Sequence, residues 1–242
     1  MSEQNEINKV KIINKPVYAL IFEDFFGEQI NKEILDEFIS LKDQFKDAVI
    51  GDVCKVDKNI RDNKVCYPDV IFLDKRNTSK LLSNLDKKFK DDVTFRETLA
   101  TAHYPVNEFL LTNYNETQIS RYGGSEQLYE WHVDRYTNPI RTISLVYYIF
   151  KKPKRFEGGQ LQFTDSPLVS SRMVDKDAEI LTIEPKNDMA IVFSSMVAHR
   201  VLPTNSPDAF EDGRFSVNCW IGVDEAKKIN EHFAKMAACL KD

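Results

Sequence analysis

The chain has 242 residues, of which 42% are hydrophobic and 29% are charged, and its formal net charge is −5 at pH 7. This length and apolar content suit a globular domain with a sizeable core, whereas the acidic balance argues against a nucleic-acid-binding protein, which needs clustered Lys and Arg. The polar start, MSEQNEINKVK, lacks the apolar core of a signal peptide, and no apolar run is long enough to cross a bilayer, so we expect a cytoplasmic protein without a membrane segment.

Extended and helical patterns alternate in the first half of the chain. Residues 17–26 (VYALIFEDFF) predict an early strand, and residues 69–73 could form another. Two further stretches have apolar residues at intervals of three and four, which is typical of the buried face of an amphipathic helix. These residues are Ile30, Ile34, Phe38, Leu41 and Phe45 in the first stretch, and Leu81, Leu82, Leu85 and Phe89 in the second. We expect both helices to pack as scaffold on a sheet.

Short strands dominate the second half. The segments RTISLVYYIF, GQLQFTD, DMAIVFSS and RFSVNCWIGV show period-two alternation or buried β character, with turn residues between them. Such a series predicts a sandwich, a jelly roll or a barrel. A last helical pattern comprises Ala226, Ile229, Phe233, Met236 and Leu240. We therefore predict one α+β domain over residues 1–242, with helical support and leading strands in 1–114, a β core in 115–223 and a C-terminal helix in 224–242.

The four cysteines, Cys54, Cys66, Cys219 and Cys239, contain no CxxC pair. Together with the expected cytoplasmic location, this spacing predicts four free thiols.

The stretch YEWHVDRY contains two candidate metal ligands, His132 and Asp134. On a strand, residues i and i+2 point to the same face, so the imidazole and the carboxylate would project side by side. A third ligand would complete a two-His, one-carboxylate triad, which suits Fe(II) and leaves adjacent positions open. Among the other histidines, His199 follows a predicted strand, whereas His103 lies in a predicted loop and His232 in the C-terminal helix. The alternative is a carboxylate that merely orients a surface imidazole.

Polar residues on the predicted strands indicate a second subsite. Arg214 and Ser216 share one face of RFSVNCWIGV, where a guanidinium fork and a hydroxyl would suit a carboxylate. Tyr122 and Tyr148 each share a strand face with other polar residues. Polar groups in a barrel interior need partners, which a polar ligand would supply. The alternatives are a solvent-exposed Arg on an edge strand and ordinary Tyr packing.

In this order, these residues resemble the Fe(II)- and 2-oxoglutarate-dependent dioxygenases, and within them the prolyl 4-hydroxylase-like branch. The family pattern Y-x(6)-Y-x-x-H-x-D corresponds to Tyr122, Tyr129, His132 and Asp134. The pattern G-G-x-L-x-F corresponds to GGQLQF, and H-R-V is followed by Arg214 and then by Trp220. The resemblance covers roughly residues 115–223, and the first half resembles the family's N-terminal support only loosely.

The resemblance implies a double-stranded β-helix, a form of jelly roll, in which His132, Asp134 and His199 bind Fe(II). It further implies that 2-oxoglutarate chelates this metal and that its far carboxylate meets Arg214. Cofactor-binding residues would then be Arg214, Ser216, Tyr122 and Tyr148, and candidate substrate residues are Tyr129, Arg141 and Trp220. O₂ would be the second cosubstrate, with ascorbate in support.

The expected reaction is hydroxylation of an unactivated C–H bond, because related halogenases lack the carboxylate that Asp134 supplies. The leading substrate is a prolyl residue in a protein or peptide, and the alternative is a free amino acid or another small metabolite. A nucleic-acid demethylase and a non-catalytic, metal-binding β-sandwich module are the remaining alternatives. The sequence does not indicate which oligomeric state the protein has.

Overall fold

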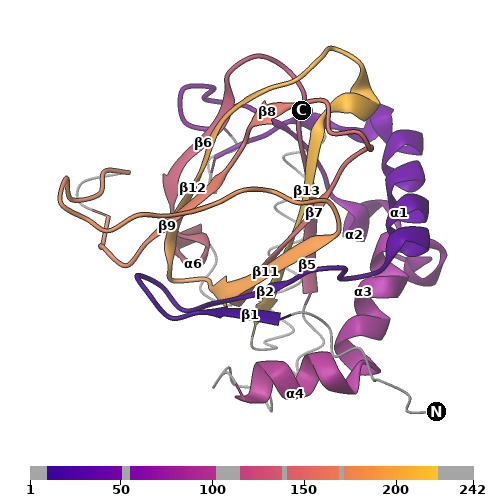
Figure 1. Ribbon diagram of the computed structural model, residues 1–242. Helices are drawn as coiled ribbons and strands as arrows, with labels where there is room; N and C mark the ends of the chain where they lie inside the picture. Colours follow the sequence, from indigo (N-terminus) through magenta and orange to yellow (C-terminus); the bar gives the residue numbers. More distant parts are fainter. Residues whose placement is uncertain (1–9, 51–54, 102–114, 138–140, 169–171, 223–242) are drawn as a thin grey trace.

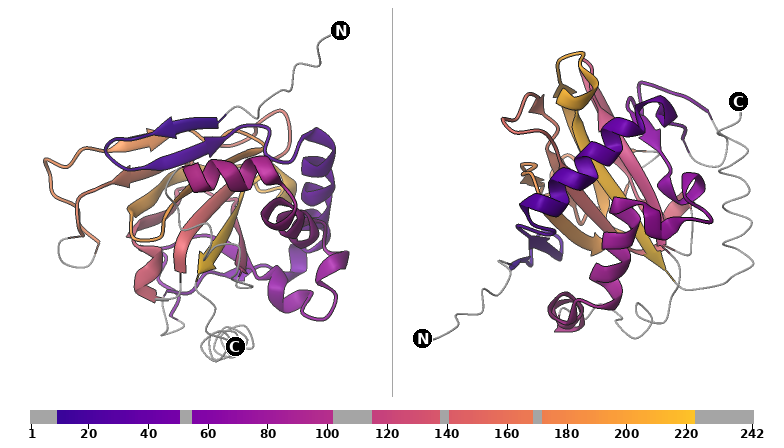
Figure 2. Two further views of the ribbon diagram at one scale, coloured as in Figure 1. Left: turned by 90° about the horizontal axis from the view of Figure 1, so that it is seen from below. Right: turned by 90° about the vertical axis from the view of Figure 1, so that its right-hand side faces the viewer.

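The computed structural model describes residues 10–50, 55–101, 115–137, 141–168 and 172–222. Within these ranges, two antiparallel sheets face each other and helices cover the outer side of the larger one (Figures 1 and 2). The expected α+β architecture, with a double-stranded β-helix at its centre, is therefore confirmed. The division of the chain into support, core and C-terminal helix remains a prediction, since residues 223–242 lie outside the described residues.

The larger sheet has eight strands in the order β1 (Val10–Ile13), β2 (Ala19–Phe22), β11 (Met189–Ser194), β7 (Arg141–Ile149), β13 (Arg214–Gly222), β5 (Asn115–Tyr122), β4 (Lys64–Cys66) and β3 (Lys46–Asp47). The smaller sheet has β10 (Leu181–Ile183), β9 (Leu161–Thr164), β12 (Ala198–Asn205) and β6 (Gln127–His132) in that order, and β8 (Glu157–Gly158) pairs with β12. The four strands predicted in the second half are β7, β9, β11 and β13.

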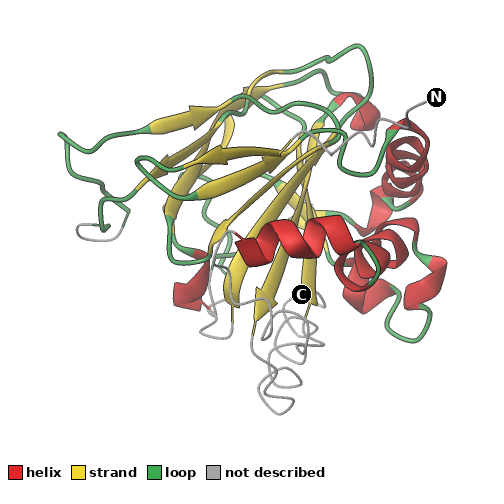
Figure 3. Cartoon of the chain, turned by 60° about the horizontal axis from the view of Figure 1, so that its bottom comes forward, coloured by secondary structure: helices red, strands yellow, loops and turns green. Residues whose placement is uncertain are grey.

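Most of the helices gather on one side of the strands, whereas α6 (Asp134–Thr137) lies apart from them (Figures 1 and 3). The helices are α1 (Glu28–Ser40), α2 (Pro68–Ile71), α3 (Lys80–Lys90), α4 (Val93–Thr101) and α6, with short 3₁₀ turns η1 (Lys42–Gln44), η3 (Arg76–Thr78) and η4 (Phe210–Asp212). The two predicted amphipathic helices are α1 and α3. Ile34 and Phe38 of α1 are buried, Ile30 and Leu41 are partly buried, and Phe45 is buried beyond the end of the helix. All four predicted apolar residues of α3 are buried. None of the helices in the described ranges is long and apolar enough to span a bilayer.

Alternation along the central strands separates a helix-facing core from the interior between the sheets. On β13, Phe215, Val217, Cys219 and Ile221 join the core under the helices. On β7, Ile143, Leu145, Tyr147 and Ile149 do the same, whereas Val146 and Tyr148 belong to the cluster between the sheets. Because successive side chains on a strand point to opposite faces, the polar residues of β13 project into the interior. This arrangement places them opposite the smaller sheet.

The first turn of α1 is tied to the larger sheet by Asp188, which precedes β11. Its carboxylate accepts hydrogen bonds from the backbone N–H groups of Phe26 and Gly27, at 3.0 and 2.8 Å. A carboxylate is favourable at the positive end of a helix, so this contact fixes where the helix begins against the sheet.

The predicted strand at residues 69–73 is wrong, because this segment forms α2 and the turn after it. Pro68 occupies the first turn, where its fixed φ favours a helix start. Asp69 is buried, accepts a hydrogen bond from the backbone N–H of Thr117 and pairs with Arg76. Leu73 is 72% exposed, so the apolar residues that suggested a strand do not form a buried face.

Two of the cysteines predicted to be free, Cys66 and Cys219, are free and buried. Burial raises the pKa of the Cys66 thiol to about 12, so it is not a reactive thiolate at neutral pH. Cys54 and Cys239 lie outside the described residues.

Candidate active site

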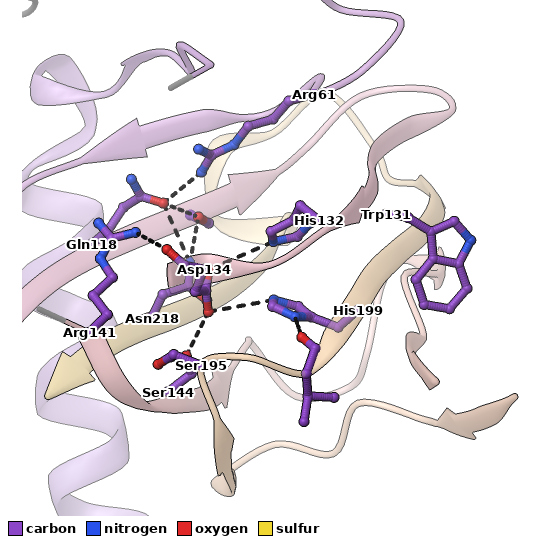
Figure 4. A network of polar contacts seen from close by, with 12 residues as sticks. Arg61, Gln118, Trp131, His132, Asp134, Arg141, Ser144, Ser195, His199 and Asn218 are labelled. Atoms are coloured by element: carbon purple, nitrogen blue, oxygen red, sulfur yellow. Dashed lines mark hydrogen bonds and ion pairs between the residues drawn. The ribbon is translucent and has the colours of Figure 1, made fainter. Parts of the chain in front are cut away.

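The three predicted metal ligands meet between β6 and β12 (Figure 4). β6 ends at His132, which is the direct antiparallel partner of His199 on β12. Antiparallel partners on one face have their Cβ atoms about 5 Å apart, which is why two histidines so distant in sequence face each other. The ligand atoms of His132, Asp134 and His199 all lie within 4.8 Å of one another, and the three residues are buried. His103 and His232 are outside the described residues.

Asp134 reaches this point differently from the prediction. It does not lie on the strand with His132, because β6 ends at His132 and Asp134 is the first residue of α6. The backbone N–H of Arg135 donates to the carbonyl of Ser195 at 3.1 Å, which anchors the start of α6 to the end of β11. The carboxylate still faces both imidazoles, since its oxygens lie 3.8 Å from Nε2 of His132 and 3.6 Å from Nε2 of His199.

Backbone carbonyls orient both imidazoles. Nδ1 of His132 lies 2.8 Å from the carbonyl oxygen of Glu130, and Nδ1 of His199 lies 2.9 Å from that of Val197. A carbonyl can only accept, so Nδ1 carries the proton and Nε2 presents its lone pair toward Asp134. Metal-binding histidines commonly have this second hydrogen bond. The donor set therefore fits a divalent first-row metal.

Two serines hold the Asp134 carboxylate in place. Ser144 Oγ donates to Asp134 at 2.6 Å and lies 2.8 Å from Ser195 Oγ, and both serines are buried. Burial alone would raise the pKa of Asp134, but the two histidines, Arg141 and the Ser144 hydrogen bond outweigh it and lower the pKa. Burial and the neighbouring His199 place the pKa of His132 well below its usual value. These shifts favour an ionised Asp134 carboxylate and a neutral His132 imidazole, which are the forms that bind a metal.

Arg214 lies fully buried in the interior, with 0% of its surface exposed. Its Cζ lies 4.9 Å from the ring centroids of both Tyr122 and Tyr148, and its Nη1 donates to Ser216 Oγ at 3.4 Å. Nε of Arg214 and the hydroxyl of Tyr148 are buried and have no hydrogen-bond partner within the described parts of the chain. Buried polar groups without partners are rare. This subsite therefore fits a ligand with acceptor oxygens, such as the far carboxylate of 2-oxoglutarate.

Gly159 makes room for this arginine. Its φ is +73°, and a Cβ atom built on it would lie 2.6 Å from Cδ and 2.9 Å from Nε of Arg214. The Gly-Gly pair noted in the sequence is thus explained by both backbone conformation and close approach.

Two of the three candidate substrate residues, Tyr129 and Arg141, contact the triad, and Trp220 packs on Arg141. Tyr129 stacks on the His132 ring, with centroids 3.6 Å apart and planes at 16°. The Arg141 guanidinium lies 3.7 Å from the Trp220 ring centroid and binds both carboxylate oxygens of Glu116, at 3.0 and 2.5 Å. The charge of Arg141 is therefore paired within the protein.

Three residues at the site were missed by sequence reasoning: Arg61, Glu116 and Ser195, whereas Gln118 was among the polar residues expected on the face of Tyr122. Arg61 donates to Gln118 at 2.6 Å and is buried. Glu116 and Gln118 alternate on β5 with the residues of its other face, which is the signal that could have placed Glu116 in the interior as well. No local pattern marks Arg61.

Comparison with known proteins supports the resemblance seen in the sequence. Residues 117–222 match the family model described as the 2OG-Fe(II) oxygenase superfamily, and this match includes all three triad residues and Arg214. The chain is thus similar to the 2OG-Fe(II) oxygenases over these residues. The resemblance seen in the sequence is thereby confirmed, and the family implies Fe(II), 2-oxoglutarate and O₂ as metal and cosubstrates.

Individual relatives agree with the prolyl hydroxylase-like branch. An uncharacterised PKHD-type hydroxylase from Synechocystis sp. is 36% identical over 91 residues, which are 37% of this chain and only 28% of the relative. A prolyl hydroxylase from Trichoplax adhaerens, solved in complex with a hypoxia inducible factor peptide fragment, has a TM-score of 0.59 at 18% identity, covering 87% of this chain and 86% of the other. A Pseudomonas putida prolyl-4-hydroxylase has a TM-score of 0.58 at 20% identity, covering 86% and 94%. The two solved structures show that the fold is shared.

Proposed function

We propose that this protein is an Fe(II)- and 2-oxoglutarate-dependent dioxygenase that hydroxylates a prolyl residue in a protein or peptide. The observation that carries the proposal is the buried triad of His132, Asp134 and His199, which shares one interior with the Arg214 subsite. In that subsite, Nε of Arg214 and the Tyr148 hydroxyl have no hydrogen-bond partner among the described residues. The descriptions of the relatives as prolyl hydroxylases, one of them bound to a peptide, support the substrate class.

The protein's own residues have separate tasks in this proposal. His132, Asp134 and His199 would hold the metal on one face and leave the opposite face open. When bound, Fe(II) with 2-oxoglutarate and O₂ supplies the oxidising power for hydroxylating an unactivated C–H bond. Ser144 and Ser195 keep the Asp134 carboxylate oriented.

The Arg214 subsite sets the orientation of the cosubstrate. A guanidinium binds a carboxylate through two parallel hydrogen bonds, and the Tyr148 hydroxyl is available as a further donor. Burial among Tyr122, Tyr148 and the strand backbones excludes water, which strengthens the charge pairing. Because the far carboxylate of 2-oxoglutarate would be held in this way, the other end of the cosubstrate would face the metal.

Hydroxylation of a free amino acid or a small acid is the second candidate. It is favoured by one observation: Arg61 is buried near the triad and has no carboxylate partner in the described parts of the chain. A purely structural metal site fits less well, since structural sites use four protein ligands and leave no open position.

The test is an assay of the purified protein with Fe(II), ascorbate and 2-oxoglutarate. Succinate would be measured against a library of proline-containing peptides and a library of free amino acids, and the product examined by mass spectrometry for an added hydroxyl group. We expect a peptide-dependent increase in succinate that is lost in His132→Ala. Hydroxylation of free amino acids alone would favour the second candidate, and failure to bind Fe(II) and 2-oxoglutarate would refute the proposal.

A further inference from the structure

Arg61 is positioned by the strand that ends in the metal ligand His132. The backbone N–H of Asp62 donates to the carbonyl of Leu128 at 2.9 Å, and that of Glu130 donates to the carbonyl of Ile60 at 2.8 Å. These bonds bracket an antiparallel bridge between Arg61 and Tyr129. The segment before β4 therefore lies along the free edge of β6, and the Arg61 side chain is directed inward from it (Figure 4).

Among the described residues, the groups that contact the Arg61 guanidinium are neutral. Nε donates to Oδ1 of Asn63 at 3.0 Å, and Nη2 donates to Oε1 of Gln118 at 2.6 Å. Cζ lies 4.5 Å from the centroid of the Tyr129 ring, which stacks on His132. Arg61 is 8% exposed, and neither an ion pair nor a hydrogen bond of Nη1 occurs within the described residues.

A buried cation without an anion is unusual, because desolvating a charge is expensive unless it is paired. The other charges in this interior have partners or would be balanced in the loaded site. Arg141 is paired with Glu116. In the loaded site a divalent metal would balance the doubly negative 2-oxoglutarate, and Asp134 would balance Arg214. Arg61 would then remain as the one unbalanced charge among the described residues of the interior.

We propose that Arg61 binds a carboxylate of the substrate and thereby positions the carbon to be hydroxylated. This inference rests on the proposed function and narrows its substrate to one with an acidic group near the reacting carbon. Two amide oxygens already fix the plane of the guanidinium, so its remaining N–H groups are pre-oriented for an incoming carboxylate. The carboxylate belongs either to an Asp or Glu side chain beside a proline or to the main chain of a free amino acid.

The experiment compares acids with their amides. One arm uses peptides in which the residue after proline is Glu or Gln, and the other uses L-proline and L-prolinamide. For wild type we expect kcat/KM to be at least about tenfold higher for the acid in one of the two arms, since each decade corresponds to about 1.4 kcal/mol. The arm that shows the preference identifies the source of the carboxylate.

Arg61→Gln should remove this preference, and Arg200→Gln should keep it. Arg200 is a matched control, because it also donates to a glutamine oxygen, that of Gln162 at 2.8 Å, and lies 4.8 Å from the Trp131 ring centroid. It neighbours His199 on β12 and therefore points to the opposite face of the strand.

Binding of 2-oxoglutarate to the Fe(II)-loaded protein without O₂, followed by calorimetry, separates this inference from the proposed function. We expect wild type and Arg61→Gln to bind it equally. If both proteins bind 2-oxoglutarate equally but wild type shows no acid preference in either arm, the role of Arg61 is refuted while the cosubstrate site stands. The same conclusion follows if wild type turns over none of these substrates. An acid preference that survives in Arg61→Gln also refutes this role. Failure of wild type to bind 2-oxoglutarate would refute the proposed function and this inference with it.

Discussion

Replacing Gly159 with alanine should weaken the binding of 2-oxoglutarate without touching a metal ligand. The new Cβ would lie 2.6 Å from Cδ of Arg214 and 2.9 Å from Oγ1 of Thr204. Carbon atoms in favourable contact are about 3.5–4.0 Å apart, so the arginine side chain has to withdraw by about 1 Å. A misplacement of about 1 Å in a binding group can reduce activity by about a hundredfold. We expect the Kd for 2-oxoglutarate to rise by about tenfold to a hundredfold.

A matched control separates this displacement from backbone strain. Gly27 also has a positive φ, +85°, but a Cβ atom there would meet nothing within 4 Å. The left-handed conformation costs a non-glycine residue about 1–2 kcal/mol, so Gly159→Ala and Gly27→Ala should both lower the free energy of unfolding by that amount in urea titrations. Only Gly159→Ala should weaken 2-oxoglutarate binding, measured by calorimetry on the Fe(II)-loaded protein. Equal affinity in the two variants would show that the Arg214 guanidinium does not receive the cosubstrate.

Three further outcomes are expected. His132→Ala should lose bound Fe(II), measured by metal analysis, together with all turnover, and normal metal content in this variant would contradict the triad. Arg214→Ala should keep its metal but lose roughly 2–5 kcal/mol of 2-oxoglutarate binding, as for a desolvated charge pair, which calorimetry would detect as a rise in Kd of more than tenfold. Burial raises the pKa of Asp69 to about 6, although Arg76 and Thr117 oppose the rise. The folded state therefore holds this proton more tightly than the unfolded state, and the contribution of Asp69 to the free energy of unfolding should fall as pH rises from about 4 to 6. The difference in unfolding free energy between wild type and Asp69→Asn should show this slope, and a flat difference would contradict it.

Periodicity in the sequence was sufficient to predict much of the β core. The alternation of RFSVNCWIGV correctly separated the face of Phe215 and Val217, which the structure packs under the helices, from the face of Arg214 and Ser216, which points into the interior. That assignment succeeds because a strand has a fixed period of two, whichever strands lie beside it. The apolar spacing of α1 and α3 was informative for the same reason.

Features that depend on contacts between distant segments were not predictable. The apolar run at residues 69–73 resembles a strand locally, but the helical start at Pro68 and the burial of Asp69 against Thr117 decide its structure. Asp134 reaches the triad from a helix start rather than from the strand, which the HxD spacing alone does not reveal. Arg61 enters the site only because its segment pairs with β6, and no local pattern indicates such an edge contact.

The pairing of His132 with His199 has a consequence for the mechanics of the smaller sheet. The ladder between β6 and β12 is interrupted by register irregularities on either side of Val201. A metal held by one histidine from each strand would fix the register at the end of this ladder where His132 faces His199, because a slip of one residue would turn one imidazole away. Ligand binding stabilises the state that binds, so metal loading should suppress local opening of these strands. Amide hydrogen exchange in β6 and β12 would then measure how firmly the metal is held.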